Sequence, residues 1–171
     1  VGEEGEGFKV AMFALENGRY TVAAGATGLL RACQDAAVKY ARERKTFGVP
    51  IGDHQLVKEM IAQMVPDSDA PRLLWLRAGW PKNEGRRNNR ETSLAKWFAT
   101  VASERSAADC VQIHGGNGFS DEYPAGRFYR NCKAAVIYEG TRETHKIMQA
   151  DYALGHRQDK PRRIELPAYK R

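Results

Sequence analysis

A long apolar stripe with helical spacing constrains the fold of this chain more than any other sequence feature. Between about Arg19 and Lys45 the apolar residues recur at alternating steps of four and three, which places them on one face of an α-helix. These residues are Val22, Ala26, Leu29, Cys33, Ala36 and Tyr40. Gly48 and Pro50 then favour the end of the helix. The stripe therefore predicts one long helix with a single buried face.

Three later segments repeat this spacing. A second helix is expected from near residue 55, a third over about 90–111 and a last one over about 141–154. The apolar positions expected to face inward are Leu56, Val57, Met60, Ile61 and Met64 in the second helix, Leu94, Trp97, Phe98, Val101 and Ala108 in the third, and Ile147, Ala150 and Leu154 in the last. Together these patterns predict an all-α fold, an antiparallel bundle of the four-helix type with four or more helices.

Three prolines disturb the second pattern. Pro66 and Pro71 fall where the helix should continue, and Pro81 falls near the end of the next apolar segment. A proline inside a helix costs about 3 kcal/mol, because it removes one backbone hydrogen bond and crowds the preceding turn. The helix therefore either breaks after Met64 and restarts near Pro71, or it continues with a kink.

Composition restricts the class of protein and of partner. The 171 residues suit a single domain, and no apolar run approaches the ~20 residues that span a bilayer, so no membrane partner is expected. The formal net charge is +6, but basic and acidic residues are interleaved, which argues against nucleic acid and favours an ordinary solvated surface, with a phosphate-bearing small molecule as the alternative. The cysteines and histidines have no metal-ligand spacing, so no metal is expected. Cys33 and Cys110 are predicted to be small core residues.

Three segments contain residues that a helical bundle does not need. They are Arg44–Gly48 with the nearby His54 and Gln55, the glycine-rich stretch Gln112–Phe119, and Ile137–Thr141. The glycines fit a tight turn between helices as well as a close approach to a ligand. Glu139 fits two roles. It is either a favourable charge near a helix N-terminus, or a carboxylate in an apolar pocket that accepts a proton as a general base.

In order and spacing, these segments resemble the acyl-CoA dehydrogenase family from about Gly5 to Gly155. The most specific part runs from Gln112 to Thr141 and includes Asp121-Glu122-Tyr123-Pro124 and Tyr138-Glu139-Gly140-Thr141. The family has a helical N-terminal domain, a middle β domain and a C-terminal four-helix bundle. The resemblance implies that residues 1–10 end the middle β domain or a linker, that 11–156 form the C-terminal helical bundle, and that 157–171 are a basic tail.

The resemblance also implies an FAD cofactor held between the subunits of a homodimer or homotetramer. Residues near the adenine-side phosphates would be Arg44, Lys45, Thr46, His54 and Gln55. Residues packed against the FAD of the neighbouring subunit would be Gln112, Ile113, His114, Gly115 and Gly116. Residues bordering the cofactor within one subunit would be Thr141, Arg142 and Glu143, with Thr141 also a plausible helix cap.

The chemistry implied by the resemblance is the α,β-dehydrogenation of an acyl-CoA thioester in fatty-acid or amino-acid catabolism. Glu139 would remove the α-proton while a hydride passes from the β-carbon to flavin N5, giving a trans-2-enoyl-CoA. The substrate would lie along Glu16, Asn17, Gly18 and Arg19 and close to Gly140. Electrons would then pass to an electron-transferring flavoprotein, in a bacterial cytoplasm or the mitochondrial matrix.

Three hypotheses remain for what the chain is. It is part of a complete acyl-CoA dehydrogenase, a separately encoded subunit that completes an active site with a partner, or a non-enzymatic helical oligomerisation module. Intact Glu139, Arg44 and Gly115-Gly116 favour the first two. In either of these cases the isolated domain is expected to be inactive alone.

Overall fold

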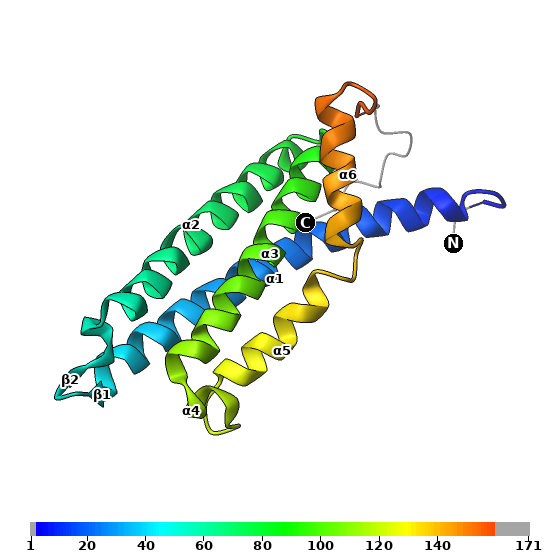
Figure 1. Ribbon diagram of the computed structural model, residues 1–171. Coiled ribbons are helices and arrows are strands. Elements are labelled where there is room, and N and C mark those ends of the chain that lie inside the picture. The colour runs from blue at the N-terminus through cyan, green and yellow to red at the C-terminus, as the bar shows by residue number, and fades with distance from the viewer. Residues whose placement is uncertain (1–2, 160–171) are drawn as a thin grey trace.

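The computed structural model describes residues 3–159 and is almost entirely helical (Figure 1). In chain order the elements are α1 (Gly7–Glu43), the hairpin strands β1 (Lys45–Thr46) and β2 (Val49–Pro50), the 3-10 helix η1 (Ile51–Asp53), α2 (Gln55–Asn83), α3 (Asn89–His114), α4 (Gly116–Phe119), α5 (Ala125–Ala135) and α6 (Arg142–Ala153). The predicted all-α bundle is confirmed. Helix α3 is its centre, because it packs against α1, α2, α5 and α6. None of the described helices is long and apolar enough to cross a membrane.

Helix α1 ends where the sequence pattern predicts but begins earlier. It ends at Glu43, and the antiparallel hairpin that follows turns through Phe47 and Gly48, both with positive φ. Its first residue is Gly7, so the predicted start near Arg19 is wrong by about three turns. The domain boundary at residue 10 stays a prediction, and residues 160–171 of the predicted basic tail lie outside the described part of the chain.

Helix α2 runs without a break through all three prolines, so of the two alternatives the interruption after Met64 is wrong and the helix continues. Tertiary packing offsets the missing backbone hydrogen bonds. Met64 and Pro71 are buried against the neighbouring helices. Asp67 is also buried, and it accepts hydrogen bonds from Arg105 at 2.9 Å and from Ser106 at 3.2 Å, both on α3. This ion pair, in which Asp67 is buried and Arg105 is half-exposed, ties the middle of α2 to the central helix.

The inward face predicted for α6 is wrong, and those predicted for α2 and α3 are wrong in part. Leu56 on α2 is 74% exposed, and Phe98 and Ala108 on α3 are also exposed. On α6 all three predicted residues, Ile147, Ala150 and Leu154, are exposed, while His145 and Met148 point inward. The buried face of α3 carries small or polar residues instead, namely Ser93, Ala95, Lys96, Ala99, Thr100, Ser103, Ala107 and Cys110. A central helix touched on several sides needs small side chains for close packing. Its larger apolar residues consequently lie at the margins.

The main core joins α1, α2, α3 and α5. Its buried residues include the three free cysteines, Cys33, Cys110 and Cys132, together with Met64 and Ile113. The prediction that Cys33 and Cys110 are small core residues is confirmed. Helix α5, which the apolar spacing did not predict, packs Ala125 and Cys132 against this core. It leads directly into the loop that carries Glu139.

Candidate active site

Glu139 lies in a tight loop between the end of α5 and the start of α6. The loop is closed by a backbone hydrogen bond from the Arg142 N–H to the Val136 carbonyl, at 3.0 Å. Glu139 and Gly140 both have positive φ, at 56° and 89°. Glycine adopts this region readily, but a glutamate does not, so Glu139 is held there by its surroundings. Thr141 caps α6 by accepting from the Thr144 N–H at 3.3 Å, which confirms the predicted helix cap.

The Glu139 carboxylate packs directly on Gly18 of α1. A Cβ atom added at Gly18 would lie 2.4 Å from Oε2 and 2.8 Å from Oε1 of Glu139, so only glycine leaves room for the carboxylate in this position. Oε2 is buried, and no residue among 3–159 donates a hydrogen bond to it. The structure therefore places a carboxylate oxygen without a partner between α1 and the loop before α6.

Two cations from different helices hold the successive carbonyls of this turn. Arg19 of α1 donates through Nε to the Glu139 carbonyl at 3.3 Å, and Lys96 of α3 donates through Nζ to the Gly140 carbonyl at 2.7 Å. Burial lowers the pKa of both side chains, that of Lys96 to about 8. Lys96 was not singled out from the sequence, where it looks like any other lysine on a helix.

His145 completes the surroundings of the turn from the α6 side. Its Nδ1 shares a hydrogen bond of 2.9 Å with the Ser93 hydroxyl, and its Nε2 lies 3.2 Å from the position of a Cβ atom on Gly140. Burial, together with the charges of Lys96 and Arg19, lowers the pKa of His145 to about 4. The Glu139 and Gly140 carbonyls oppose this shift, although Nε2 makes no hydrogen bond of normal geometry. His145 is therefore uncharged near neutral pH.

A groove of about 530 Å³ opens beside this turn, between the first turns of α1, the start of α3 and α6. Of the residues predicted to bind substrate, Glu16 and Arg19 line it. Asn17 does not line the groove. Its side chain is directed toward α2, where it accepts a hydrogen bond from Lys82.

The same groove contains polar residues that sequence reasoning missed. Arg87, Asn89 and Arg157 line it, and Asn89 is only 8% exposed. Asn89 Oδ1 and Arg87 Nε are buried and have no hydrogen-bond partner in the described part of the chain. No local sequence pattern marks Arg87, Asn89 or Arg157. These atoms give the groove unused hydrogen-bonding capacity.

A second cavity, of about 350 Å³, brings together two of the predicted cofactor segments. Arg44 and Thr46 line it from the hairpin side, and Ile113, His114, Gly115 and Gly116 line it from the end of α3. His54 belongs to the same cluster, because its Nε2 lies 2.8 Å from the Thr46 hydroxyl. Lys45, Gln55 and Gln112 are exposed and do not line the cavity.

The third predicted cofactor segment, Thr141–Glu143, lies at the opposite end of the bundle. The helical residues from Arg19 to Glu43 span roughly 36 Å at about 1.5 Å per residue. Figure 1 shows the hairpin at one end of α1 and α6 toward the other. Within one chain, Thr141–Glu143 therefore lie far from the cavity that Arg44 lines.

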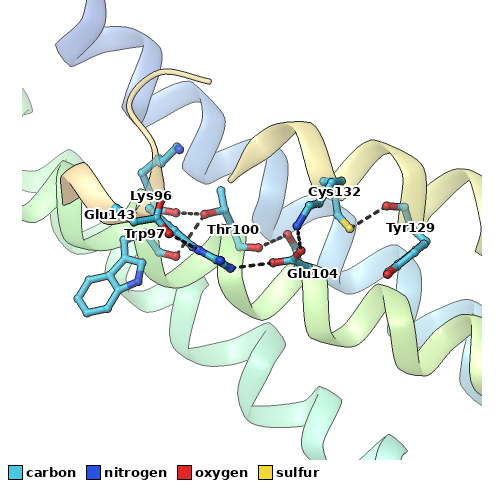
Figure 2. Close-up of polar contacts among 10 residues, drawn as sticks. Lys96, Trp97, Thr100, Glu104, Tyr129, Cys132 and Glu143 are labelled. Carbon is cyan, nitrogen blue, oxygen red and sulfur yellow. Dashed lines mark hydrogen bonds and ion pairs between the residues drawn. The ribbon is translucent and has the colours of Figure 1, made fainter. Parts of the chain in front are cut away.

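Charged side chains fix the start of α6 to the neighbouring helices (Figure 2). Glu104 of α3 accepts from Lys133 of α5 and, at 3.5 Å, from Arg142 of α6. Arg142 also donates to Glu143 at 2.6 Å. Arg142 and Glu143 are thereby held at the first turn of α6, immediately after Glu139.

Comparison with known proteins identifies the fold. The chain matches the model of the acyl-CoA dehydrogenase C-terminal domain over residues 5–154. It is 41% identical over 158 residues to glutaryl-CoA dehydrogenase of Desulfococcus multivorans, covering 92% of this chain and 41% of that protein.

Solved structures agree with this match. The structure of a glutaryl-CoA dehydrogenase in complex with glutaryl-CoA has 40% sequence identity and a TM-score of 0.89, covering 92% of this chain and 40% of that one. A chain in the structure of the electron-transferring flavoprotein of Acidaminococcus fermentans has 42% identity and a TM-score of 0.87, covering 90% of this chain and 40% of that one.

These matches identify the family of the helical bundle. The chain belongs to the acyl-CoA dehydrogenase family and corresponds to its C-terminal domain. This confirms the resemblance recognised from Gln112–Thr141. The chain spans 41% of the length of the glutaryl-CoA dehydrogenase that it matches.

Proposed function

We propose that this chain supplies the C-terminal helical part of an FAD-dependent enzyme that dehydrogenates an acyl-CoA thioester to a trans-2-enoyl-CoA. The observation that carries the proposal is the position of Glu139. Its carboxylate packs on Gly18, and its buried Oε2 has no hydrogen-bond donor among the described residues. A carboxylate oxygen without a partner is free to accept a proton from a substrate carbon.

In the proposed reaction, Glu139 takes the α-proton of the thioester. The backbone N–H of Glu139 makes no hydrogen bond within residues 3–159, so it is free to donate to the thioester oxygen. This donation would stabilise the negative charge that develops on that oxygen as the proton leaves. Bound FAD would accept the hydride that leaves the β-carbon. Gly140 would border the acyl chain through its backbone, since His145 occupies the space that a Cβ atom would take, 3.2 Å from Nε2.

The residues present fit an FAD held between two chains. Arg44 offers a guanidinium group for the diphosphate, and added Cβ atoms at Gly115 and Gly116 would meet nothing within 4 Å, so a ligand can approach the backbone. Thr141, Arg142 and Glu143 would hold a cofactor at the other end of the bundle. Because roughly 36 Å of helix separates the two ends, we propose that each FAD takes one set from each of two subunits.

The groove beside the Glu139 turn suits the acyl-CoA substrate. Arg19, Arg87 and Arg157 line it, and among residues 3–159 only Glu16 adds a carboxylate, so the groove favours an anionic ligand. The unpartnered Asn89 Oδ1 and Arg87 Nε can bind polar groups of the same ligand. Guanidinium groups bind phosphates well, so we propose that this groove takes the phosphate-bearing part of coenzyme A.

The proposal extends to partners and location. Large apolar residues of α2, among them Leu56, Leu73 and Trp80, are 67–74% exposed, which supports burial against another domain or subunit in a homodimer or homotetramer. Electron-transferring flavoprotein is the proposed acceptor of the electrons, and a bacterial cytoplasm or the mitochondrial matrix is the proposed location.

Replacing Glu139 tests the proposal in the flavin-loaded enzyme that contains this chain. Glu139→Gln keeps the shape of the side chain but cannot accept the α-proton. We expect flavin reduction to slow by roughly 10⁴-fold or more, the upper end of the usual effect of a general base. Flavin content and acyl-CoA binding should be unchanged. The measurement is anaerobic bleaching of the flavin by a panel of straight-chain, branched and dicarboxylic acyl-CoA thioesters, with the exposed Glu122→Gln as a matched control.

Rapid bleaching in the Glu139→Gln variant would mean that the base lies elsewhere, and Glu16 on the groove would then be the first residue to replace. Failure of every thioester in the panel to bleach the unmodified enzyme would contradict the proposed reaction. It would leave the non-enzymatic oligomerisation module as the surviving hypothesis.

A further inference from the structure

Lys96 is a fully buried cation near the start of the central helix α3. Its side chain is 0% exposed, and it forms no ion pair with any carboxylate in the described part of the chain. Its Nζ donates to the Gly140 carbonyl at 2.7 Å. Removing an ammonium group from water without a paired carboxylate is unfavourable. A contribution to stability therefore does not explain Lys96, because an apolar side chain could pack in the same place without the cost of burying a charge.

We infer that Lys96 is a positioning residue for Glu139, holding the Gly140 carbonyl from α3 and so fixing the turn that directs the Glu139 carboxylate. The inference rests on the proposed function, in which Glu139 accepts the α-proton. Lys96 itself does not reach the reacting atoms in this role. It acts through the backbone of the next residue.

The conformation of the turn explains why such an anchor matters. Glu139 has a φ of 56° and Gly140 a φ of 89°, and an L-residue such as Glu139 disfavours this region. Arg19 holds the Glu139 carbonyl at 3.3 Å, and Lys96 holds the following carbonyl at the shorter distance of 2.7 Å. Rotation of the 139–140 peptide would break the hydrogen bond from Arg19, and rotation of the 140–141 peptide would break the one from Lys96. The carboxylate of Glu139 is thus directed by two anchors from two helices.

The groups around Lys96 make its protonation depend on pH near 8. The groups that face it are Arg19 of α1, Glu139 of the turn and His145 of α6, which burial keeps neutral. Helices α2 and α5 place no carboxylate of the described chain in ion-pair contact with it. Burial first, and then Arg19, lowers the pKa of Lys96 to about 8, with Glu139 opposing. Above this pH the ammonium group that holds Gly140 is progressively lost.

The test compares Lys96→Met with Lys96→Arg in the flavin-loaded enzyme. The exposed α2 residue Lys58 offers a matched control, Lys58→Met. The rate of flavin reduction is measured anaerobically with saturating glutaryl-CoA and butyryl-CoA, together with flavin content, thermal midpoint and acyl-CoA affinity. We expect Lys96→Met to slow reduction by roughly 10²-fold, the effect of misplacing a catalytic group by about 1 Å. Acyl-CoA affinity should remain that of the unmodified enzyme, and Lys96→Arg should recover much of the rate.

The pH profile separates positioning from stability. In the unmodified enzyme the rate should fall as the pH rises through about 8. In Lys96→Arg the fall should move to higher pH, because an arginine stays charged. Loss of the Lys96 proton would not lower the rate by unfolding the protein. Because the pKa of this buried amine is lowered, the unfolded chain binds more protons between pH 8 and 10.5, so the contribution of Lys96 to stability rises over that range.

Two results would overturn the inference. One is a Lys96→Met enzyme that reduces its flavin at the unmodified rate while Glu139→Gln is inactive, which would leave the proposed function intact. The other is an alkaline fall at the same pH in the unmodified and Lys96→Arg enzymes. The second comparison does not require Lys96→Met to fold. An active Glu139→Gln variant would instead contradict the proposed function itself.

Discussion

Acid should destabilise this domain through His145, and a single substitution can isolate the effect. His145 is fully buried between α3 and α6, with Nδ1 bonded to Ser93 and with Lys96 and Arg19 nearby. Protonation would place a third cation beside these two, away from water. The pKa of His145 is accordingly lowered from its ordinary 6.5 to about 4. In the unfolded chain the imidazole takes up its proton near the ordinary value.

The difference between these pKa values sets the sign and the size of the effect. Between pH 6.5 and 4 the unfolded chain binds the proton and the folded chain does not, so stability falls as the pH falls. The contribution is complete above pH 6.5 and lost below about 4. At 1.36 kcal/mol per pKa unit, the loss amounts to about 3 kcal/mol. For a chain of this size that corresponds to roughly 6–12 °C in thermal midpoint.

The assay is thermal unfolding of the unmodified protein and of His145→Gln, followed side by side from pH 7.5 to 4. Glutamine is of similar length and polarity but does not titrate in this range, so the difference between the two proteins isolates His145 from every other acid-sensitive group. We expect His145→Gln to become relatively more stable as the pH falls below 6.5. A difference in midpoint that stays constant over the whole range would refute the reasoning.

Two further substitutions probe the Glu139 turn. Gly18→Ala should slow flavin reduction by up to roughly 10²-fold, because its Cβ atom would push the Glu139 carboxylate from its place. Gly25→Ala on the same helix, where nothing lies within 4 Å, should leave the rate unchanged, and neither variant should lower the thermal midpoint. Equal rates in the two variants would argue against the observed carboxylate position. Thr141→Ala should cost about 1 kcal/mol in unfolding free energy by removing the cap of α6, and Thr141→Ser should restore it.

The four longer apolar patterns predicted helices correctly, because apolar spacing is a local property of the sequence, whereas α5 and the start of α1 were missed. The long stripe before Glu43 and the cap at Thr141 both correspond to observed helix ends. The continuity of α2 was not predictable, since it depends on burial of Pro71 and on the contact between Asp67 and Arg105, which are 38 residues apart. Tertiary contacts outweighed the local effect of proline there.

The residues of the candidate site were accessible from the sequence, whereas their arrangement was not. Glu139 came from the motif around it, but its contact with Gly18 and the bond from Arg19 join positions about 120 apart. Lys96 lies 44 positions from the carbonyl that it holds, in a helix whose inward face was predicted from its large apolar residues. Because that face is small and polar, hydrophobic periodicity could not identify it.

Position 139 also bears on how such a domain can be stabilised. Its backbone lies in the left-handed region, which costs an L-residue roughly 1–2 kcal/mol and which asparagine and glycine tolerate best. A search for more heat-resistant variants would therefore tend to enrich Glu139→Asn or Glu139→Gly. Both would relax the backbone, and both would remove the carboxylate that packs on Gly18. Selection for stability alone would thus tend to erase the candidate site, so heat resistance should be sought at positions such as Gly25, where a side chain meets nothing.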